Sequence, residues 1–138
     1  MTPIDRNSKR VVLLVEDDEQ VRELSSYILK EAGYVVISAG DASDALRTSR
    51  EYGGVIDVLL TDVEVGDADG ITLAREITAQ RPETGVLLTS GNSDYKSRTE
   101  FLLLPKPFTP QNLLNGVAAA IKRVETGRKH RRSRSNGI

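Results

Sequence analysis

The sequence predicts an α/β domain in which a doubly wound, five-stranded parallel sheet is covered by helices on both faces. Short apolar runs, at residues 11–15 and 58–61 for example, are typical of strands that are buried on both sides. Segments with apolar residues at helical spacing separate these runs, so strands and helices alternate along the chain. Acidic residues directly follow two of the runs, and ligands of such open sheets bind beyond the carboxyl ends of the strands.

Each strand is predicted from an apolar run of its own. The five runs comprise residues 11–15, 34–38, 55–61, 86–89 and 101–104. All are short, rich in valine, leucine and isoleucine, and bounded by polar residues or glycine, as buried strands are.

The helices between them are predicted from stripes of apolar residues and from their end signals. The first stripe comprises Val21, Leu24, Ser25, Ile28, Leu29 and Ala32 and is closed by Gly33. Asp41 and Asp69 are expected N-caps, and Thr109 with Pro110 opens the last helix. The segment between Ser90 and Phe101 has no apolar stripe, which favours a single turn or a loop over a full fourth helix.

Composition excludes several classes of function. At 138 residues the chain suits one domain with a core of its own. It contains no cysteine, so disulfides, thiolate metal sites and a thiol nucleophile are excluded. No apolar stretch approaches the length of a membrane span, and the first residues lack the apolar centre of a signal peptide. We therefore expect a cytoplasmic protein.

The net charge of −1 hides a marked asymmetry. Five of the 19 basic residues lie after residue 127 and all 20 acidic residues lie before it, so residues 1–127 carry 14 − 20 = −6. We expect residues 1–9 to be a flexible N-terminus, residues 10–125 the folded domain and residues 126–138 a disordered basic tail. An acidic body argues against a general nucleic-acid surface on the domain.

Three carboxylates and one lysine follow the predicted strands and are expected to converge. Glu16 and Asp17 follow the first strand, Asp62 follows the third, and Lys106 follows the fifth between two prolines. Clustered carboxylates repel one another unless a cation lies among them, and oxygen ligands suit Mg²⁺. The sequence therefore predicts a magnesium-binding crevice with one ammonium group opposite the acids.

Five short motifs in this order resemble the receiver domain of two-component response regulators. They comprise residues 14–18, 60–62, 69–70, 88–91 and 106–108, and the resemblance covers residues 10 to about 124. It implies a flavodoxin-like sheet with strand order 2-1-3-4-5. It also implies a phospho-accepting switch of the single-domain type with a shortened fourth helix.

The resemblance assigns the phosphorylation chemistry to three residues. Asp62 would be phosphorylated, and Lys106 would pair first with Asp62 and then with the phosphoryl group. Ser90 would donate its hydroxyl to the phosphoryl oxygens, and we favour it over Thr89 because the small residue Gly91 follows it. The Lys106–Pro107 peptide bond is expected to be cis.

The same resemblance assigns the metal ligands. Asp17, Asp62 and the backbone carbonyl of Glu64 would bind Mg²⁺ directly, and Glu16 would act through a coordinated water. No other cofactor is expected. Such a protein is not an enzyme in the usual sense, since it assists its own phosphorylation and dephosphorylation.

The chain departs from the family pattern in ways that concern its output. The stretch from Ser90 to Lys106 is shorter than usual, and Leu103 replaces the aromatic switch residue. Val65 and Gly66 replace the frequent Met-Pro pair. These changes place the usual output surface in question more than the phosphorylation chemistry.

The expected partners are a histidine kinase or phosphotransfer protein and a downstream protein target, with no membrane contact. A monomer or a weak dimer is expected. The basic tail is interpreted first as solubilising disorder, with contact to nucleic acid or an acidic partner, or a linker remnant, as alternatives. Two alternative functions remain open: a degenerate receiver acting as a non-phosphorylated interaction module, and a Mg²⁺-dependent phosphohydrolase, although the second aspartate that such hydrolases typically use is Glu64 here.

Overall fold

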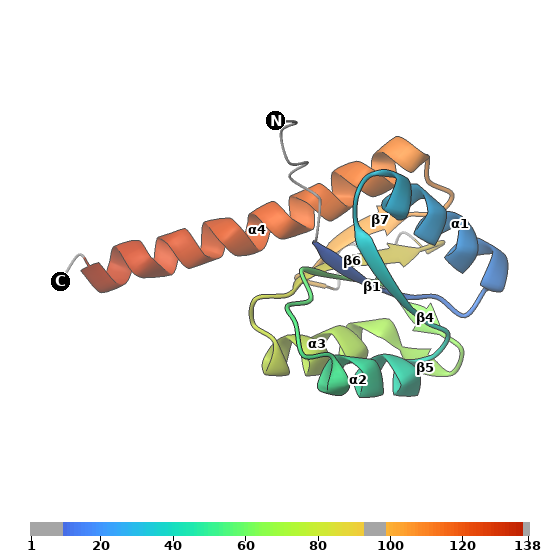
Figure 1. The fold of residues 1–138 in the computed structure, drawn as a ribbon, viewed down its shortest axis with the longest axis horizontal. Helices are drawn as coiled ribbons and strands as arrows, with labels where there is room; N and C mark the ends of the chain where they lie inside the picture. The colour runs from blue at the N-terminus through green and yellow to red at the C-terminus, as the bar shows by residue number, and fades with distance from the viewer. Residues whose placement is uncertain (1–9, 93–98, 137–138) are drawn as a thin grey trace.

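The central sheet has the topology that the sequence predicts. The computed structural model describes residues 10–92 and 99–136, with side chains described as far as residue 127. Five parallel strands lie in the order β2-β1-β3-β6-β7 (Figure 1). Their bounds are Val11–Val15 for β1, Val35–Ala39 for β2, Val58–Asp62 for β3, Gly85–Ser90 for β6 and Leu102–Pro105 for β7. Because β6 and β7 are the fourth and fifth strands of this sheet, the flavodoxin-like order is confirmed.

Helices cover both faces of the sheet, two on each side (Figure 1). One face carries α1, Glu19–Glu31, and α4, Pro110–Asn136, and the other carries α2, Ala42–Glu51, and α3, Gly70–Gln80. Alternate residues of β1 serve the two resulting cores: Leu13 faces α2 and α3, whereas Val12 and Leu14 face α1 and α4. All three are nearly or fully buried, which explains why this strand is apolar throughout.

Aspartates begin the first three helices. Asp18, Asp41 and Asp69 each accept a hydrogen bond from a backbone N–H in the first turn. The caps at Asp41 and Asp69 are those that the sequence predicts. Asp69 therefore fixes the start of α3.

The loop expected after β3 contains a small hairpin. Two-residue strands β4, Glu64–Val65, and β5, Ala68–Asp69, pair antiparallel. A strand of two residues is too short to show the alternation of polar and apolar residues that identifies a strand, so the sequence did not predict β4 and β5. The side chain of Val65 is buried, which anchors the hairpin to the core beside Asp62.

The carboxyl-terminal helix differs from prediction. We expected disorder from residue 126, but the backbone of α4 remains helical to Asn136 and projects beyond the sheet (Figure 1). Arginine and lysine are good helix formers, and extending an existing helix by one residue costs little.

Two further expectations concern the chain between β6 and β7 and the membrane. The predicted turn or loop in place of a fourth helix falls largely on residues 93–98, which lie outside the described residues. Strand β7 is only partly buried, unlike β1 and β6. In residues 10–92 and 99–136, no helix is long and apolar enough to span a bilayer.

The contact between Gly70 and the end of β3 generates a test of the fold. A Cβ at position 70 would lie 2.0 Å from the carbonyl oxygen of Asp62, whereas a Cβ at Gly53 would meet nothing within 4 Å. We expect Gly70→Ala to lower the free energy of unfolding by about 2–3 kcal/mol, because rigid backbone must move. Gly53→Ala should change it by about 0.5 kcal/mol or less. Urea unfolding followed by circular dichroism measures both, and equal stabilities of the two variants would contradict the close approach.

Candidate functional site

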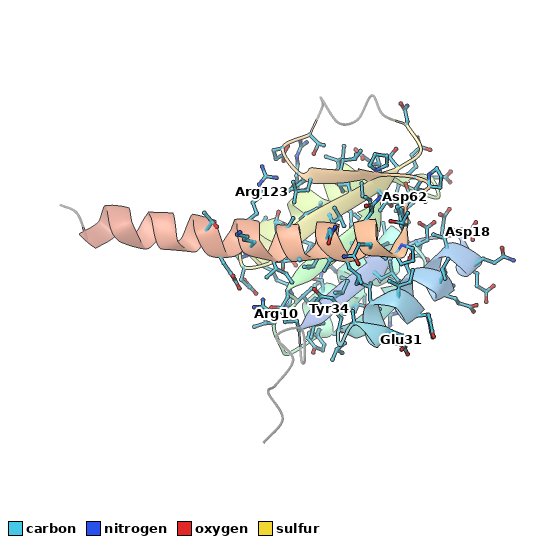
Figure 2. All side chains as sticks on the ribbon, turned by 90° about the horizontal axis from the view of Figure 1, so that it is seen from above. Arg10, Asp18, Glu31, Tyr34, Asp62 and Arg123 are labelled. Carbon is cyan, nitrogen blue, oxygen red and sulfur yellow. The ribbon has the colours of Figure 1, made fainter. Side chains whose placement is uncertain are left out.

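Four neighbouring strands deliver the predicted residues to one end of the sheet. Glu16 directly follows β1, Asp62 and Ser90 end β3 and β6, and Lys106 directly follows β7. Because these strands are parallel and adjacent, their carboxyl ends meet. Figure 2 shows Asp62 and Asp18 at this end of the molecule, away from the projecting part of α4.

Lys106 bridges two carboxylates that come from different strands. Its Nζ lies 2.5 Å from Oδ2 of Asp62 and 3.0 Å from Oε2 of Glu16. The Glu16 side chain is 5% exposed, that of Asp62 14% and that of Lys106 25%. One ammonium group therefore compensates two acids in a partly dehydrated setting, where charge–charge interactions are stronger than in water.

Burial and pairing act in opposite directions on this cluster. Burial raises the pKa of the Glu16 carboxyl, and the hydrogen bonds from Lys106 and from the Asp18 N–H offset this only in part. For Lys106, burial lowers the pKa, but the hydrogen bonds to Asp62 and Glu16 outweigh it and the net pKa is raised. The lysine is thus held firmly in its charged form.

Glu16 is fixed on three sides. Its Oε1 accepts from the Asp18 N–H at 3.2 Å, and its backbone carbonyl accepts from Nη1 of Arg22 at 2.8 Å. With Lys106 on Oε2, this side chain has little freedom to move. Arg22 was not singled out from the sequence, because an arginine on the second turn of a helix belongs to no motif.

A polar cavity of about 410 Å³ opens beside Asp62. Its walls comprise Asp17, Asp62, Glu64, Gly66, Ser90, Gly91, Asn92 and Lys106. Asp17 is exposed, and its Oδ2 accepts from the Gly66 N–H at 3.2 Å, a contact between the first loop and the hairpin that the sequence did not indicate. The Glu64 N–H donates to Oδ1 of Asp62 at 3.0 Å, so both oxygens of Asp62 have a donor.

Ser90 and not Thr89 belongs to the cavity wall. The Ser90 Oγ accepts from the Asn92 N–H at 2.9 Å and lies 3.2 Å from the Asn92 carbonyl oxygen. Thr89 is buried and opens onto no part of this cavity. Successive residues of a strand face opposite sides, so only one of the two hydroxyls can serve the site.

The oxygen atoms that line the cavity suit a divalent cation such as Mg²⁺, although the carboxylates do not surround a single point. Within the described part of the chain no three acidic or histidine side chains converge on one point. Asp17, Asp62 and Glu64 nevertheless line the same cavity with oxygen atoms. Mg²⁺ commonly keeps several waters and binds one or two carboxylates together with phosphate oxygens, so this arrangement suffices. Glu16 is engaged by Lys106 and lies outside the cavity wall.

Comparison with known families and proteins agrees with this geometry. The family described as response regulator receiver domain matches residues 12–118. The chain is 30% identical over 112 residues to the response regulator receiver protein CpdR of Brucella abortus, covering 77% of this chain and 92% of CpdR. It is 31% identical over 127 residues to the sensor kinase CckA of the same organism, covering 88% of this chain and 13% of CckA.

Solved structures agree in fold. A receiver domain protein from Clostridium thermocellum superposes with a TM-score of 0.75 at 26% identity, over 85% of this chain and 98% of that one. The chain spans only 13% of CckA and 50% of the transcriptional regulatory proteins AruR and GltR of Pseudomonas aeruginosa, so the activities of those whole proteins do not carry over.

The double bridge of Lys106 generates a stability test. We expect Lys106→Met to lower the free energy of unfolding at neutral pH by about 2 kcal/mol, because Glu16 is left buried without its cation. The pKa of Glu16 is raised in the folded state, so its ionisation costs stability as the pH rises above the ordinary value near 4.5. The loss should therefore shrink as the pH falls toward that value.

Urea unfolding over a pH series measures this loss. Glu16→Gln in the Lys106→Met background should restore most of the stability, and Lys122→Met on the exposed surface of α4 is the matched control. A loss that is independent of pH, or that Glu16→Gln does not relieve, would contradict the bridge.

Proposed function

Since the chain belongs to the response regulator receiver domain family, we propose that it is a phospho-accepting switch of a two-component relay, with Asp62 as the phosphorylated residue. The observation that carries this proposal is the position of Asp62, whose carboxylate is held by Lys106 and opens onto the same cavity as Ser90. A nucleophile, a fixed cation and a hydroxyl donor around one polar cavity are what phosphoryl transfer requires.

The transfer is assigned to the carboxylate of Asp62. One of its oxygens attacks the phosphorus of a phosphohistidine on the partner, the P–N bond breaks, and the histidine nitrogen leaves with the electron pair. Lys106 pairs with Asp62 beforehand and afterwards faces the new phosphoryl oxygens. The ammonium group of Lys106 stays bound to Glu16 during this exchange, because the contact between Lys106 and Glu16 does not involve Asp62.

Ser90 is the proposed switch residue. Its hydroxyl is now engaged with the Asn92 backbone, and a phosphoryl group in the cavity would compete for it. Phosphorylation adds about −1.5 to −2 charges, so the competition favours the phosphoryl oxygens. Drawing Ser90 toward Asp62 would shift the chain between β6 and β7, which is how the signal would leave the site.

Asp17, Asp62 and the carbonyl of Glu64 are the proposed holders of Mg²⁺. The ion would neutralise the charge that develops on the phosphoryl oxygens during transfer. Asp17 supports this assignment because it is exposed, lines the cavity and accepts a hydrogen bond from the Gly66 N–H through its carboxylate.

The proposed phosphoryl donor is a histidine kinase or a phosphotransfer protein, and the output is a contact with another protein. The similarity to a segment of the sensor kinase CckA supports a place in such a relay. The protein would assist its own phosphorylation and later hydrolysis without turning over a free substrate. A cytoplasmic location remains part of this proposal.

Metal binding generates the first test of the proposal. Millimolar Mg²⁺ should raise the melting temperature, because an ion that binds only the folded state stabilises it by mass action. Asp17→Asn should abolish the increase, whereas Asp67→Asn, on the hairpin that Asp17 contacts but outside the cavity wall, should retain it. Thermal unfolding with Mg²⁺ and with a chelator measures this. An unchanged response in Asp17→Asn would remove Asp17 from the metal site.

Phosphorylation of Asp62 is tested by mass. Incubation with acetyl phosphate and Mg²⁺ should add one phosphoryl group to the intact protein, and Asp62→Asn or omission of Mg²⁺ should prevent it. Asp69→Asn is the matched control, since Asp69 caps α3. A wild-type protein that binds Mg²⁺ without gaining mass would indicate the interaction module. Continuous release of phosphate from simple esters over many turnovers would indicate the hydrolase.

A further inference from the structure

The loop between β1 and α1 carries two acids of the site and presents them to different surroundings. The Glu16 side chain is buried and bonded to Lys106, whereas the Asp17 side chain is exposed and lines the cavity. Asp18 then caps α1 at the same end of the molecule (Figure 2). The orientation of the peptide unit between Glu16 and Asp17 therefore affects where both carboxylates lie.

Arg22 holds this peptide unit from the second turn of α1. Its side chain is partly buried, and its Nη1 donates to the Glu16 carbonyl oxygen at 2.8 Å. The guanidinium also lies against the residue that follows β2, since a Cβ on Gly40 would lie 3.5 Å from Nη1. No carboxylate of the described residues forms an ion pair with Arg22. Its polar partner in the described ranges is therefore a peptide carbonyl, and a charged donor makes that hydrogen bond a strong one.

The surroundings of Asp17 leave one of its carboxylate oxygens open. On the side of the sheet, the Glu16 N–H donates to the Ala39 carbonyl at 3.2 Å, so the backbone before Asp17 is held. Oδ2 of Asp17 accepts from the Gly66 N–H, and Oδ1 takes no hydrogen bond from any residue of the described ranges. Asp17 can thus offer Oδ1 to a ligand, and the position of its carboxylate depends on the peptide unit that Arg22 holds.

We propose that Arg22 is a positioning residue for Mg²⁺ binding and for phosphoryl uptake by Asp62, and that it acts through the Glu16 carbonyl on the carboxylate of Asp17. The inference rests on the proposed function, because that function assigns Asp17 to the metal. Arg22 itself lies outside the cavity wall. Groups that orient a metal ligand without touching the metal commonly weaken metal binding by roughly 10- to 100-fold when they are removed.

The sign of the effect on Mg²⁺ affinity separates positioning from charge. Arg22 is a cation close to a loop that must accept a dication, so its charge alone opposes Mg²⁺, and removal of that charge alone would strengthen binding. Loss of the hydrogen bond to Glu16 instead frees the loop to move, which weakens binding. A purely structural role would lower the stability of the metal-free protein and leave the affinity for Mg²⁺ unchanged.

Titration of the full, isotope-labelled chain with magnesium chloride, followed by NMR through the backbone amide of Gly66, measures the dissociation constant for Mg²⁺. Arg22→Met and Arg22→Gln should each raise this constant by about tenfold, and both residues are good helix formers that should retain α1. Arg22→Lys keeps a charged donor and should raise the constant by about threefold at most. Lys30→Met removes the same charge from an exposed position at the far end of α1 and should change the constant by about twofold at most.

Phosphoryl uptake from acetyl phosphate, followed by intact mass, should slow in Arg22→Met and recover in Arg22→Lys. Circular dichroism and melting without metal check that all variants fold. An unchanged or lower dissociation constant in Arg22→Met and Arg22→Gln, or an equal rise in Lys30→Met, would overturn the proposal. A wild-type chain that binds Mg²⁺ without gaining a phosphoryl group would overturn the phospho-switch alone, and the dissociation constants would still decide the role of Arg22.

Discussion

The Lys106 ammonium group is the interaction on which the site depends. Without it, Glu16 and Asp62 would face each other across a partly dehydrated space, and repulsion would push the two carboxylates apart. The lysine comes from the fifth strand and the two acids from the second and third positions of the sheet, so the bridge forms only when the sheet is complete. Asp62 is therefore held in position by Lys106 only after the sheet has folded correctly.

Most of the fold could be predicted because each signal was local. Apolar runs such as residues 11–15 are unambiguous when a strand is buried on both faces, and aspartates at helix starts carry their own hydrogen-bonding reason. The site followed from topology: residues after parallel strands must meet. The cis peptide bond between Lys106 and Pro107 is also confirmed, although only the family resemblance indicated it.

What escaped prediction depended on contacts between distant segments or on helical register. On α4, Ala118 is exposed and Ala120 is buried, because the buried stripe follows Leu113, Val117 and Ala120 and winds away from position 118. Arg22 reaches the Glu16 carbonyl, and the hairpin after β3 reaches Asp17, through geometry that no sequence pattern displays. The roles of Glu16, Asp17, Ser90 and Glu64 in metal and phosphate binding stay predictions.

The backbone hydrogen-bond ladder does not stop where the strands stop. The N–H groups of Glu16, Val63 and Lys106 lie just beyond β1, β3 and β7, yet they donate to the carbonyls of Ala39, Thr89 and Ser90 at 3.2, 2.9 and 2.8 Å. Amide hydrogens held in this way exchange with solvent only when the sheet edge opens. The peptide backbone beneath the carboxylates is therefore as rigid as the sheet itself, and any change of geometry around Asp62 falls to the side chains.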